Sequence, residues 1–183
     1  MPRKRDAELE GRILEAAYGL WERGGEGALT MRAVARAAKT TTPTVYERFR
    51  DKRDLLELLR RHARGKLVEA LEPAPNAAET CRCFLEFARS HPNEYRLVTA
   101  DWAVRLSRKE TKPSYELIKR RLANDLGGEP EEHARLALAL GELLHGTAIM
   151  LLVEGVHERV ATELRHACMA ACGTLIQHAA GAW

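Results

Sequence analysis

Threonines and basic residues gather between residues 28 and 53, where they offer the chemistry of phosphate binding. The only acidic residues there are Glu47 and Asp51, against Arg32, Arg36, Lys39, Arg48, Arg50, Lys52 and Arg53. Four threonines and a tyrosine lie among these cations, at Thr40, Thr41, Thr42, Thr44 and Tyr46. Lys and Arg attract phosphates, and hydroxyls bind phosphates and base edges. The pattern predicts a nucleic-acid-binding surface, although a solvated basic face would show the same charges.

Charge is distributed unevenly along the chain. The formal net charge is +3, yet residues 1–64 hold 15 Lys and Arg against 10 Asp and Glu, whereas residues 65–183 hold 14 against 16. A basic first third on a near-neutral remainder is expected of a phosphate-binding module. The basic tail at Arg3, Lys4 and Arg5 is interpreted either as an arm that reaches DNA or as a disordered terminus.

Other chemistry has little support in the residue pattern. The chain contains no phosphate-binding glycine loop, Gly-x-Ser-x-Gly elbow or His-Glu-x-x-His pair, so we expect neither an enzyme nor a cofactor. The cysteines form two pairs in the sequence, Cys81 with Cys83 and Cys168 with Cys172. Only the second pair would share a helix face. Thiol or metal sensing is kept as an alternative to packing as small hydrophobic residues.

Composition favours a folded, helical chain. The 183 residues have a mass of 20.5 kDa, which is enough for one domain or two small ones. A hydrophobic content of 45% with only 5% aromatics favours helices over sheets. Cysteines without a signal peptide predict a cytoplasmic protein with reduced thiols. The most apolar stretch, residues 136–153, carries Glu142 and His145, so no membrane span is expected.

Caps and apolar spacing divide the first third into four helices. We expect them at residues 6–23, 31–37, 41–47 and from 51 onward. Gly24-Gly25 would end the first, and Thr30, Thr41 and Asp51 would cap the other three. Two short helices between longer ones describe a helix-turn-helix module, whose second short helix enters the major groove.

A longer residue pattern extends through this module without a gap, over about residues 9–56. It consists of the run Ile13-Leu14-Glu15-Ala16-Ala17 and of Trp21, Gly24, Thr30, Val34, Ala35, Ala38, Thr44, Val45, Tyr46, Phe49, Lys52, Leu55 and Leu56. This pattern resembles the DNA-binding domain of the TetR family of transcriptional regulators. The resemblance implies an all-helical homodimer that represses transcription from a palindromic operator and is released by a small molecule.

The resemblance also assigns roles to individual residues. It implies DNA contacts from the recognition helix by Thr41, Thr42, Thr44 and Tyr46, and phosphate contacts by Thr30, Arg32 and Lys52. The chain departs from the family at Lys39 and Pro43, where glycine is usual, and at Thr40, where an aliphatic residue is usual. A residue other than glycine in a left-handed turn costs roughly 1–2 kcal/mol. Lys39 therefore either bears strain, which an ammonium reaching a phosphate would offset, or sits in a different turn.

A proline-rich break at residues 72–76 separates the module from the rest. We expect a DNA-binding domain at 1–56, a linking helix to about 71 and a second domain at 72–183. Five further helices are expected at about 77–90, 92–107, 113–126, 130–154 and 157–178. The predicted fold is all-α, with about nine helices: a three-helix helix-turn-helix module and a helical bundle for ligand binding and dimerisation.

The last two predicted helices are rich in small residues, among them Ala137, Gly141, Gly146, Ala167 and Ala170. Small residues let helix axes approach closely, so a two-fold four-helix interface is expected there, as the resemblance also implies. The alternative is that both helices pack within one monomer.

A small-molecule site is expected in the second domain. His145 lies in the centre of an apolar helix and needs a partner, which a ligand or a core residue could supply. The other candidates for the lining are Phe84, Phe87, Tyr95, Trp102, Tyr115, Leu117, Ile149 and Met150. Aromatic residues with one or two polar groups suit a ligand site, but a core uses nearly the same residues.

Together these features predict a cytoplasmic, ligand-responsive, homodimeric repressor. Its expected partners are double-stranded operator DNA, a second copy of the chain and an unknown small-molecule inducer, with no membrane. The alternative is a helical dimeric interaction protein, or a thiol- or metal-sensing protein, with weak or lost DNA binding. Titration with mixed-sequence DNA at low salt separates these interpretations.

Overall fold

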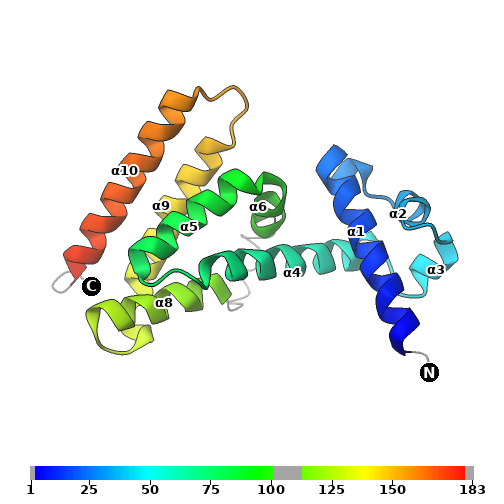
Figure 1. The fold of residues 1–183 in the computed structure, drawn as a ribbon, viewed down its shortest axis with the longest axis horizontal. Coiled ribbons are helices and arrows are strands. Elements are labelled where there is room, and N and C mark those ends of the chain that lie inside the picture. The colour runs from blue at the N-terminus through cyan, green and yellow to red at the C-terminus, as the bar shows by residue number, and fades with distance from the viewer. Residues whose placement is uncertain (1–2, 101–112, 180–183) are drawn as a thin grey trace. The chain divides into compact units, whose positions relative to one another are not determined.

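The computed structural model describes residues 3–100 and 113–179, and within them it has helices and no strand (Figure 1). The chain divides into two units, Met1–Ala63 and Arg64–Trp183. The described helices are α1 (Arg3–Ala28), α2 (Met31–Ala37), α3 (Thr42–Tyr46), α4 (Lys52–Leu71), α5 (Ala77–Ser90), α6 (Pro92–Thr99), α8 (Pro113–Leu126), a 3₁₀ turn at Pro130–His133, α9 (Ala134–Leu151) and α10 (Glu158–Gln177). The predicted all-α class is confirmed.

Side-chain caps fix the starts of α2, α3 and α4. Thr30, Thr41 and Asp51 each accept a hydrogen bond from the backbone N–H three residues further on, at 3.1, 3.3 and 3.0 Å. Each bond satisfies one of the N–H groups that a helix start leaves without a partner. These are the three caps that the sequence predicts.

The first helix is longer than expected. It already includes Arg3, so residues 3–5 belong to α1 and the interpretation of them as an arm outside the helix is wrong. Lys, Arg and Glu are good helix formers, and the helix runs through Asp6, although Asp is a residue type that favours N-caps. At the other end, Gly24 (φ −154°) and Gly25 (φ 57°) interrupt the helix as predicted, and one more turn follows to Ala28.

The core of the first unit is built from one face of each helix. It contains the fully buried side chains of Ile13, Ala17, Val34, Val45, Leu55 and Leu59. These residues recur three or four positions apart within α1 and α4, which places them on one face. The opposite faces of α2 and α3 are left to solvent.

In the second unit, α9 and α10 lie side by side and run in opposite directions, and α5 packs against both (Figure 1). The N-cap of α5 is Asn76, whose Oδ1 accepts a hydrogen bond from Glu79 N at 2.8 Å. The predicted helix at 92–107 is described as α6 only to Thr99, and the rest of it lies outside the described residues. The helix predicted at 130–154 starts as a 3₁₀ turn, and its α-helical part ends at Leu151.

One helical stretch among the described residues, Pro130–Leu151, is long and apolar enough to cross a membrane by length and composition alone. Only 28% of its most apolar 18-residue window is buried. The expectation that the chain has no membrane span therefore stays a prediction, which rests on Glu142 and His145.

Candidate nucleic-acid interface and small-molecule cavity

An open depression on the first unit is formed by α2, the turn after it and the start of α3. It is lined by Thr30, Arg32, Ala33, Ala35, Arg36, Thr40, Thr41 and Thr42. Arg32 and Arg36 stand four residues apart, and therefore on the same side of α2. The depression offers hydroxyls and guanidinium groups side by side, which is the chemistry that a phosphate backbone requires.

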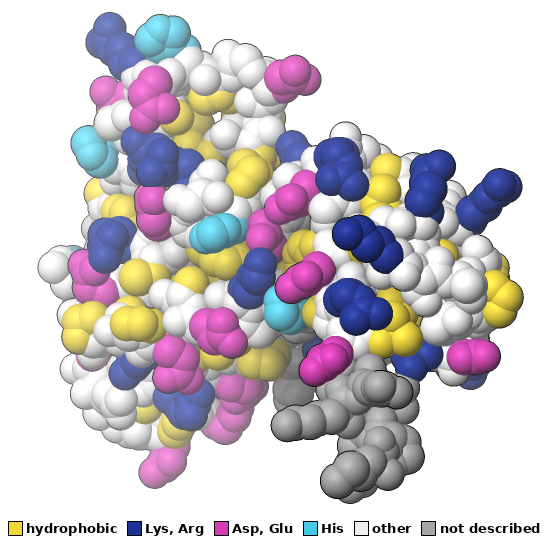
Figure 2. All heavy atoms as spheres, turned by 45° about the vertical axis from the view of Figure 1, so that its right-hand side comes forward, with side chains coloured by type: hydrophobic (Ala, Val, Ile, Leu, Met, Phe, Trp, Pro, Cys, Tyr) yellow, Lys and Arg dark blue, Asp and Glu magenta, His cyan; other side chains and the backbone are white. Residues whose placement is uncertain are grey.

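Three cations near this depression are available to a ligand. Arg32, Arg36 and Lys39 are exposed, and none of their side chains makes a hydrogen bond or ion pair with the described residues. By contrast, Arg50 Nε lies 3.1 Å from Asp54 Oδ2. Lys and Arg side chains gather on the right-hand part of Figure 2, which the first unit forms. Arg36 was not among the predicted contacts, although its spacing from Arg32 was a usable signal.

Lys39 occupies a left-handed turn, with φ 53°. Its N–H donates to the carbonyl of Arg36 at 3.2 Å, and the N–H of Thr40 donates to the carbonyl of Ala35 at 2.9 Å. This pair of bonds is the Schellman motif, whose left-handed position usually holds glycine. Lys39 therefore bears the strain of a left-handed turn, which costs roughly 1–2 kcal/mol, and does not sit in a different turn. The strained backbone presents an ammonium group beside the depression.

Some polar side chains of the candidate recognition helix, α3, are exposed, and others form hydrogen bonds within the helix and its cap. Tyr46 is 52% exposed, and Thr42 is half-buried at the edge of the depression. Thr41 and Thr44 join their hydroxyls at 2.8 Å, in addition to the cap that Thr41 forms. Val45 is fully buried and anchors the helix. Thr42 and Tyr46 are thus the α3 side chains best placed for a partner.

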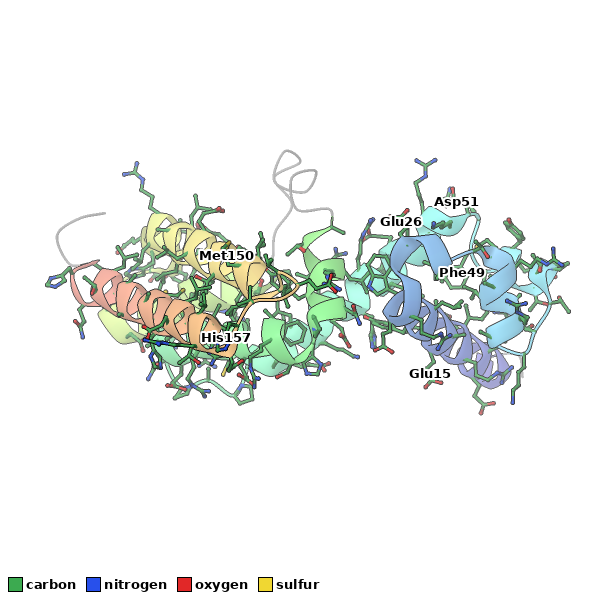
Figure 3. All side chains as sticks on the ribbon, turned by 90° about the horizontal axis from the view of Figure 1, so that it is seen from above. Glu15, Glu26, Phe49, Asp51, Met150 and His157 are labelled. Carbon is green, nitrogen blue, oxygen red and sulfur yellow. The ribbon has the colours of Figure 1, made fainter. Side chains whose placement is uncertain are left out.

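Lys52, predicted to contact a phosphate, is held by the end of α1. Its Nζ donates to the backbone carbonyl of Glu26 at 2.7 Å and lies 3.6 Å from Glu26 Oε1. Figure 3 labels Glu26 on this part of α1. The two residues are 26 positions apart, so no local pattern could have revealed the pair.

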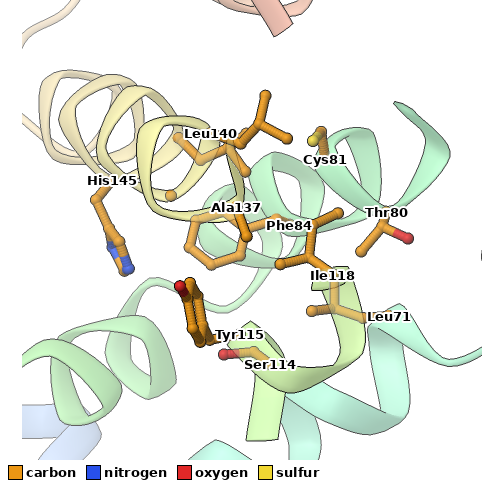
Figure 4. A pocket seen from close by; sticks show the side chains of 12 residues that line it. Leu71, Thr80, Cys81, Phe84, Ser114, Tyr115, Ile118, Ala137, Leu140 and His145 are labelled. Atoms are coloured by element: carbon orange, nitrogen blue, oxygen red, sulfur yellow. The ribbon is translucent and has the colours of Figure 1, made fainter. Parts of the chain in front are cut away.

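The second unit contains a partly open cavity of about 50 Å³ between α5, α8, α9 and the last residue of α4 (Figure 4). Its lining consists of Leu71, Thr80, Cys81, Phe84, Ser114, Tyr115, Ile118, Ala137, Leu140, Gly141, Leu144 and His145. Three predicted residues, Phe84, Tyr115 and His145, meet there.

The other candidates for the cavity lie elsewhere. Phe87 and Leu117 are buried but do not line the cavity. Ile149 and Met150 are 58% and 50% exposed, and Met150 is labelled on α9 in Figure 3. Ile149 and Met150 were predicted to line the cavity but are exposed, because the sequence shows that α9 is apolar but not which of its faces meets the other helices. Trp102 lies outside the described residues.

His145 has a partner within the second unit, the tyrosine of α6. The hydroxyl of Tyr95 lies 2.8 Å from Nδ1 of His145, and the ring of Phe84 meets the imidazole edge-on, with centroids 5.0 Å apart. Burial raises the pKa of the Tyr95 hydroxyl well above its ordinary value. This hydroxyl therefore stays protonated at physiological pH and orients the imidazole at the cavity wall.

Three of the four thiols come together, which the sequence did not predict. The thiol of Cys172 lies near those of Cys168 and Cys81, and all three are buried. The interaction with Cys168 lowers the pKa of Cys172, but the interaction with Cys81 and burial raise it to about 12. The interaction with Cys172, together with burial, raises the pKa of Cys168. A protonated, buried thiol reacts slowly, so this geometry does not favour redox sensing.

Two family models cover most of the chain. Residues 13–59 match the bacterial regulatory proteins of the tetR family, and residues 77–173 match the tetracyclin repressor-like C-terminal domain. No curated protein matches the sequence.

Solved structures of regulators share the fold. A TetR-like transcriptional regulator from Rhodococcus sp. RHA1 superposes with a TM-score of 0.61 at 22% identity, covering 100% of both chains. A TetR-family regulator from Streptomyces coelicolor A3 gives 0.59 at 20% identity, over 97% of this chain and 99% of that one. The multidrug binding protein EbrR, complexed with proflavin, gives 0.59 at 19% identity, over 91% and 99%.

Proposed function

The chain belongs to the tetR family of bacterial regulatory proteins, and we propose that it is a cytoplasmic homodimeric repressor that a small molecule releases from a palindromic operator. As a member of this family it is a DNA-binding transcriptional regulator and not an enzyme. Beyond family membership, we propose the dimer, the residues that contact the operator, the release by a small molecule and the repression of transcription.

The observation that carries the proposal is a group of cations around the first unit's depression whose side chains are unpaired among the described residues. These are Arg32, Arg36 and Lys39, and the nearby helix α3 carries the half-buried Thr42 and the exposed Tyr46. We assign the three cations to phosphates, because charge gives affinity without sequence information. We assign Thr42 to a base edge, where its hydroxyl and methyl group can be read.

Most of the other residues predicted to contact DNA already use their polar groups in hydrogen bonds within the protein. Thr30 caps α2, and Thr41 caps α3 and also binds the Thr44 hydroxyl. These hydroxyls therefore have only part of their hydrogen-bonding capacity left for DNA. Tyr46 offers its hydroxyl to the backbone. Lys52 reaches a phosphate only by leaving, or sharing, the carbonyl of Glu26.

Exposed apolar residues on α9, on α10 and in the turn between them support the dimer. Leu138, Ile149 and Met150 of α9, Val153 of the turn and Val160 of α10 are each 47–58% exposed. Large exposed apolar surfaces mark interfaces, and the same helices expose small residues such as Gly146 and Ala167. A second copy that packs these two helices against their equivalents buries this surface in a four-helix interface.

The cavity supports the response to a ligand, and EbrR in complex with proflavin is an example of this fold with a bound small molecule. The cavity lining includes Leu71, the last residue of α4. Helix α4 is continuous back to Lys52, so a displacement at Leu71 acts on the same helix that carries Lys52. Binding in the cavity would thereby shift the population of DNA-binding conformations.

Titration with labelled mixed-sequence DNA at low salt tests DNA binding itself. We expect measurable affinity that falls steeply with salt. Tyr46→Ala is expected to weaken binding to all sequences, whereas Thr42→Ala is expected to change the preferred sequence. A folded protein without affinity at low salt would instead support a helical interaction protein.

A further inference from the structure

Among the described residues, the lining of the second unit's cavity consists of apolar side chains, hydroxyls, a thiol and an imidazole. None of its twelve described lining residues is Asp, Glu, Lys or Arg. The nearest turn of α8 does hold a buried cation, Lys119. However, its Nζ lies 2.6 Å from Glu131 and 2.9 Å from Glu116, so its charge is already paired.

A charged ligand would meet a high cost in this lining. Moving an ion out of water into an apolar site without a counter-ion is expensive. The polar groups that the cavity does offer are hydroxyls and an imidazole. The Thr80 hydroxyl donates to the carbonyl of Asn76 at 2.8 Å, which leaves its lone pairs to accept a hydrogen bond. Such groups select a ligand with a neutral hydrogen-bonding group.

Aromatic side chains line another part of the cavity. Phe84 and His145 meet at an interplanar angle of 85°, and Figure 4 shows Tyr115 extending toward the same space. Edge-to-face and offset arrangements of this kind accept one more aromatic ring. Ala137 and Gly141 also line the cavity and contribute little bulk, and a Cβ atom added at Gly141 would meet nothing within 4 Å.

The volume limits the size of the ligand. A water molecule takes about 30 Å³, and a cavity of about 150 Å³ holds benzene, whereas this one measures about 50 Å³. The cavity is thus about a third of the size that holds benzene, so a single ring enters only if the partly open lining widens, and several fused rings would require still larger displacements.

We propose that this cavity binds an uncharged single-ring compound that carries one hydrogen-bonding group, and that it rejects cations and anions of the same size. The inference deepens the proposed ligand response and rests on it for its biological meaning. Binding itself can be measured without DNA.

Three probes of nearly equal size test the proposal: benzyl alcohol, benzylamine as the cation and benzoate as the anion. Binding to the full-length chain at pH 7.5 is measured by calorimetry and by ligand-observed NMR. Benzyl alcohol is expected to bind at least tenfold more tightly than either ion. Equal or tighter binding of an ion, or no binding of benzyl alcohol at 10 mM, overturns the proposal.

A matched pair of variants checks that the cavity is the site. Ser114 lies at the start of α8, where an acidic residue is favoured by the helix dipole. Ser114→Asp is expected to improve benzylamine binding and weaken benzoate binding, whereas Ser114→Asn is expected to keep the wild-type order. An unchanged order in Ser114→Asp would place the binding elsewhere and overturn the proposal.

Operator release is then measured separately with the same probes. If benzyl alcohol binds but leaves a protein–operator complex intact, the ligand class stands and the proposed inducer response fails. If a charged probe releases the operator and benzyl alcohol does not, the ligand class fails and the response stands.

Discussion

The hydroxyl of Tyr95 lies 2.8 Å from Nδ1 of His145, which joins α6 to the centre of α9 across 50 positions of sequence. The bond supplies the polar partner that an imidazole on an apolar helix needs. Because Tyr95 is 1% exposed, water cannot readily replace its hydroxyl.

Tyr95→Phe is therefore expected to destabilise the protein by about 1–3 kcal/mol, the cost of leaving a buried polar group without its partner. Urea unfolding followed by circular dichroism measures the change. Tyr46→Phe is the matched control, because Tyr46 is 52% exposed and water can bind the hydroxyl there. Equal losses in the two variants would contradict the importance of the bond.

Lys39→Gly separates strain from charge in the turn before α3. The variant is expected to be about 0.5–1 kcal/mol more stable, because relief of the left-handed strain exceeds the extra backbone entropy of glycine. It is also expected to bind operator more weakly, since an ammonium group is lost. Lys39→Arg keeps the charge and should keep the affinity. Unchanged operator affinity in Lys39→Gly would argue against a phosphate contact.

Arg36→Gln tests the depression on the first unit. Removal of one phosphate contact is expected to lower affinity for all sequences and to reduce the slope of log K against log salt by about 1. Fluorescence anisotropy at several salt concentrations measures both quantities. Arg120→Gln removes the same charge from an exposed position on α8 and is expected to change neither. If both variants behave alike, only the net charge matters.

Ile149→Glu tests the α9–α10 dimer. The side chain is 58% exposed in one chain, so the fold should persist, but in a two-fold interface a carboxylate from each copy would be buried. Loss of an Ile contact is worth about 1.5–3 kcal/mol, which raises the dimer dissociation constant by about tenfold to a hundredfold or more. Analytical ultracentrifugation measures it. Leu126→Glu, at an exposed apolar residue of α8, should leave the dimer intact.

Thiol reactivity tests whether the cysteine cluster senses oxidants. Burial and raised pKa values reduce the thiolate fraction of Cys168 and Cys172 at pH 8, and the thiolate is the reactive form. A thiol reagent added to the native protein is therefore expected to modify Cys83, which is partly exposed, much faster than these two. Mass spectrometry at timed intervals identifies the sites. Rapid modification of Cys168 or Cys172 would revive the sensing interpretation.

Local signals predicted the local structure well. Thr30, Thr41 and Asp51 start helices because a side-chain oxygen can reach an amide three residues away, and Gly24-Gly25 interrupts α1 because glycine tolerates a positive φ. Even the unusual turn at Lys39 was visible as a departure from the family pattern.

Features that depend on tertiary packing were less accessible. The pairs Tyr95–His145 and Lys52–Glu26 join distant positions, and so does the contact of Cys81 with Cys172. Periodicity identifies an apolar helix but not its partners, which is why Ile149 and Met150 were assigned to a cavity and lie instead on the exposed surface.

If two copies of the chain read a palindrome through α3, bound DNA should show it. Sequences that bind can be selected from a random DNA pool, and the mass of the protein–DNA complex can be measured in solution. We expect an enriched palindrome whose half-site centres lie about 34–36 Å apart, or one helical turn, bound by a multiple of two chains. A folded protein that enriches no sequence, or that binds an asymmetric site as a single chain, would contradict it.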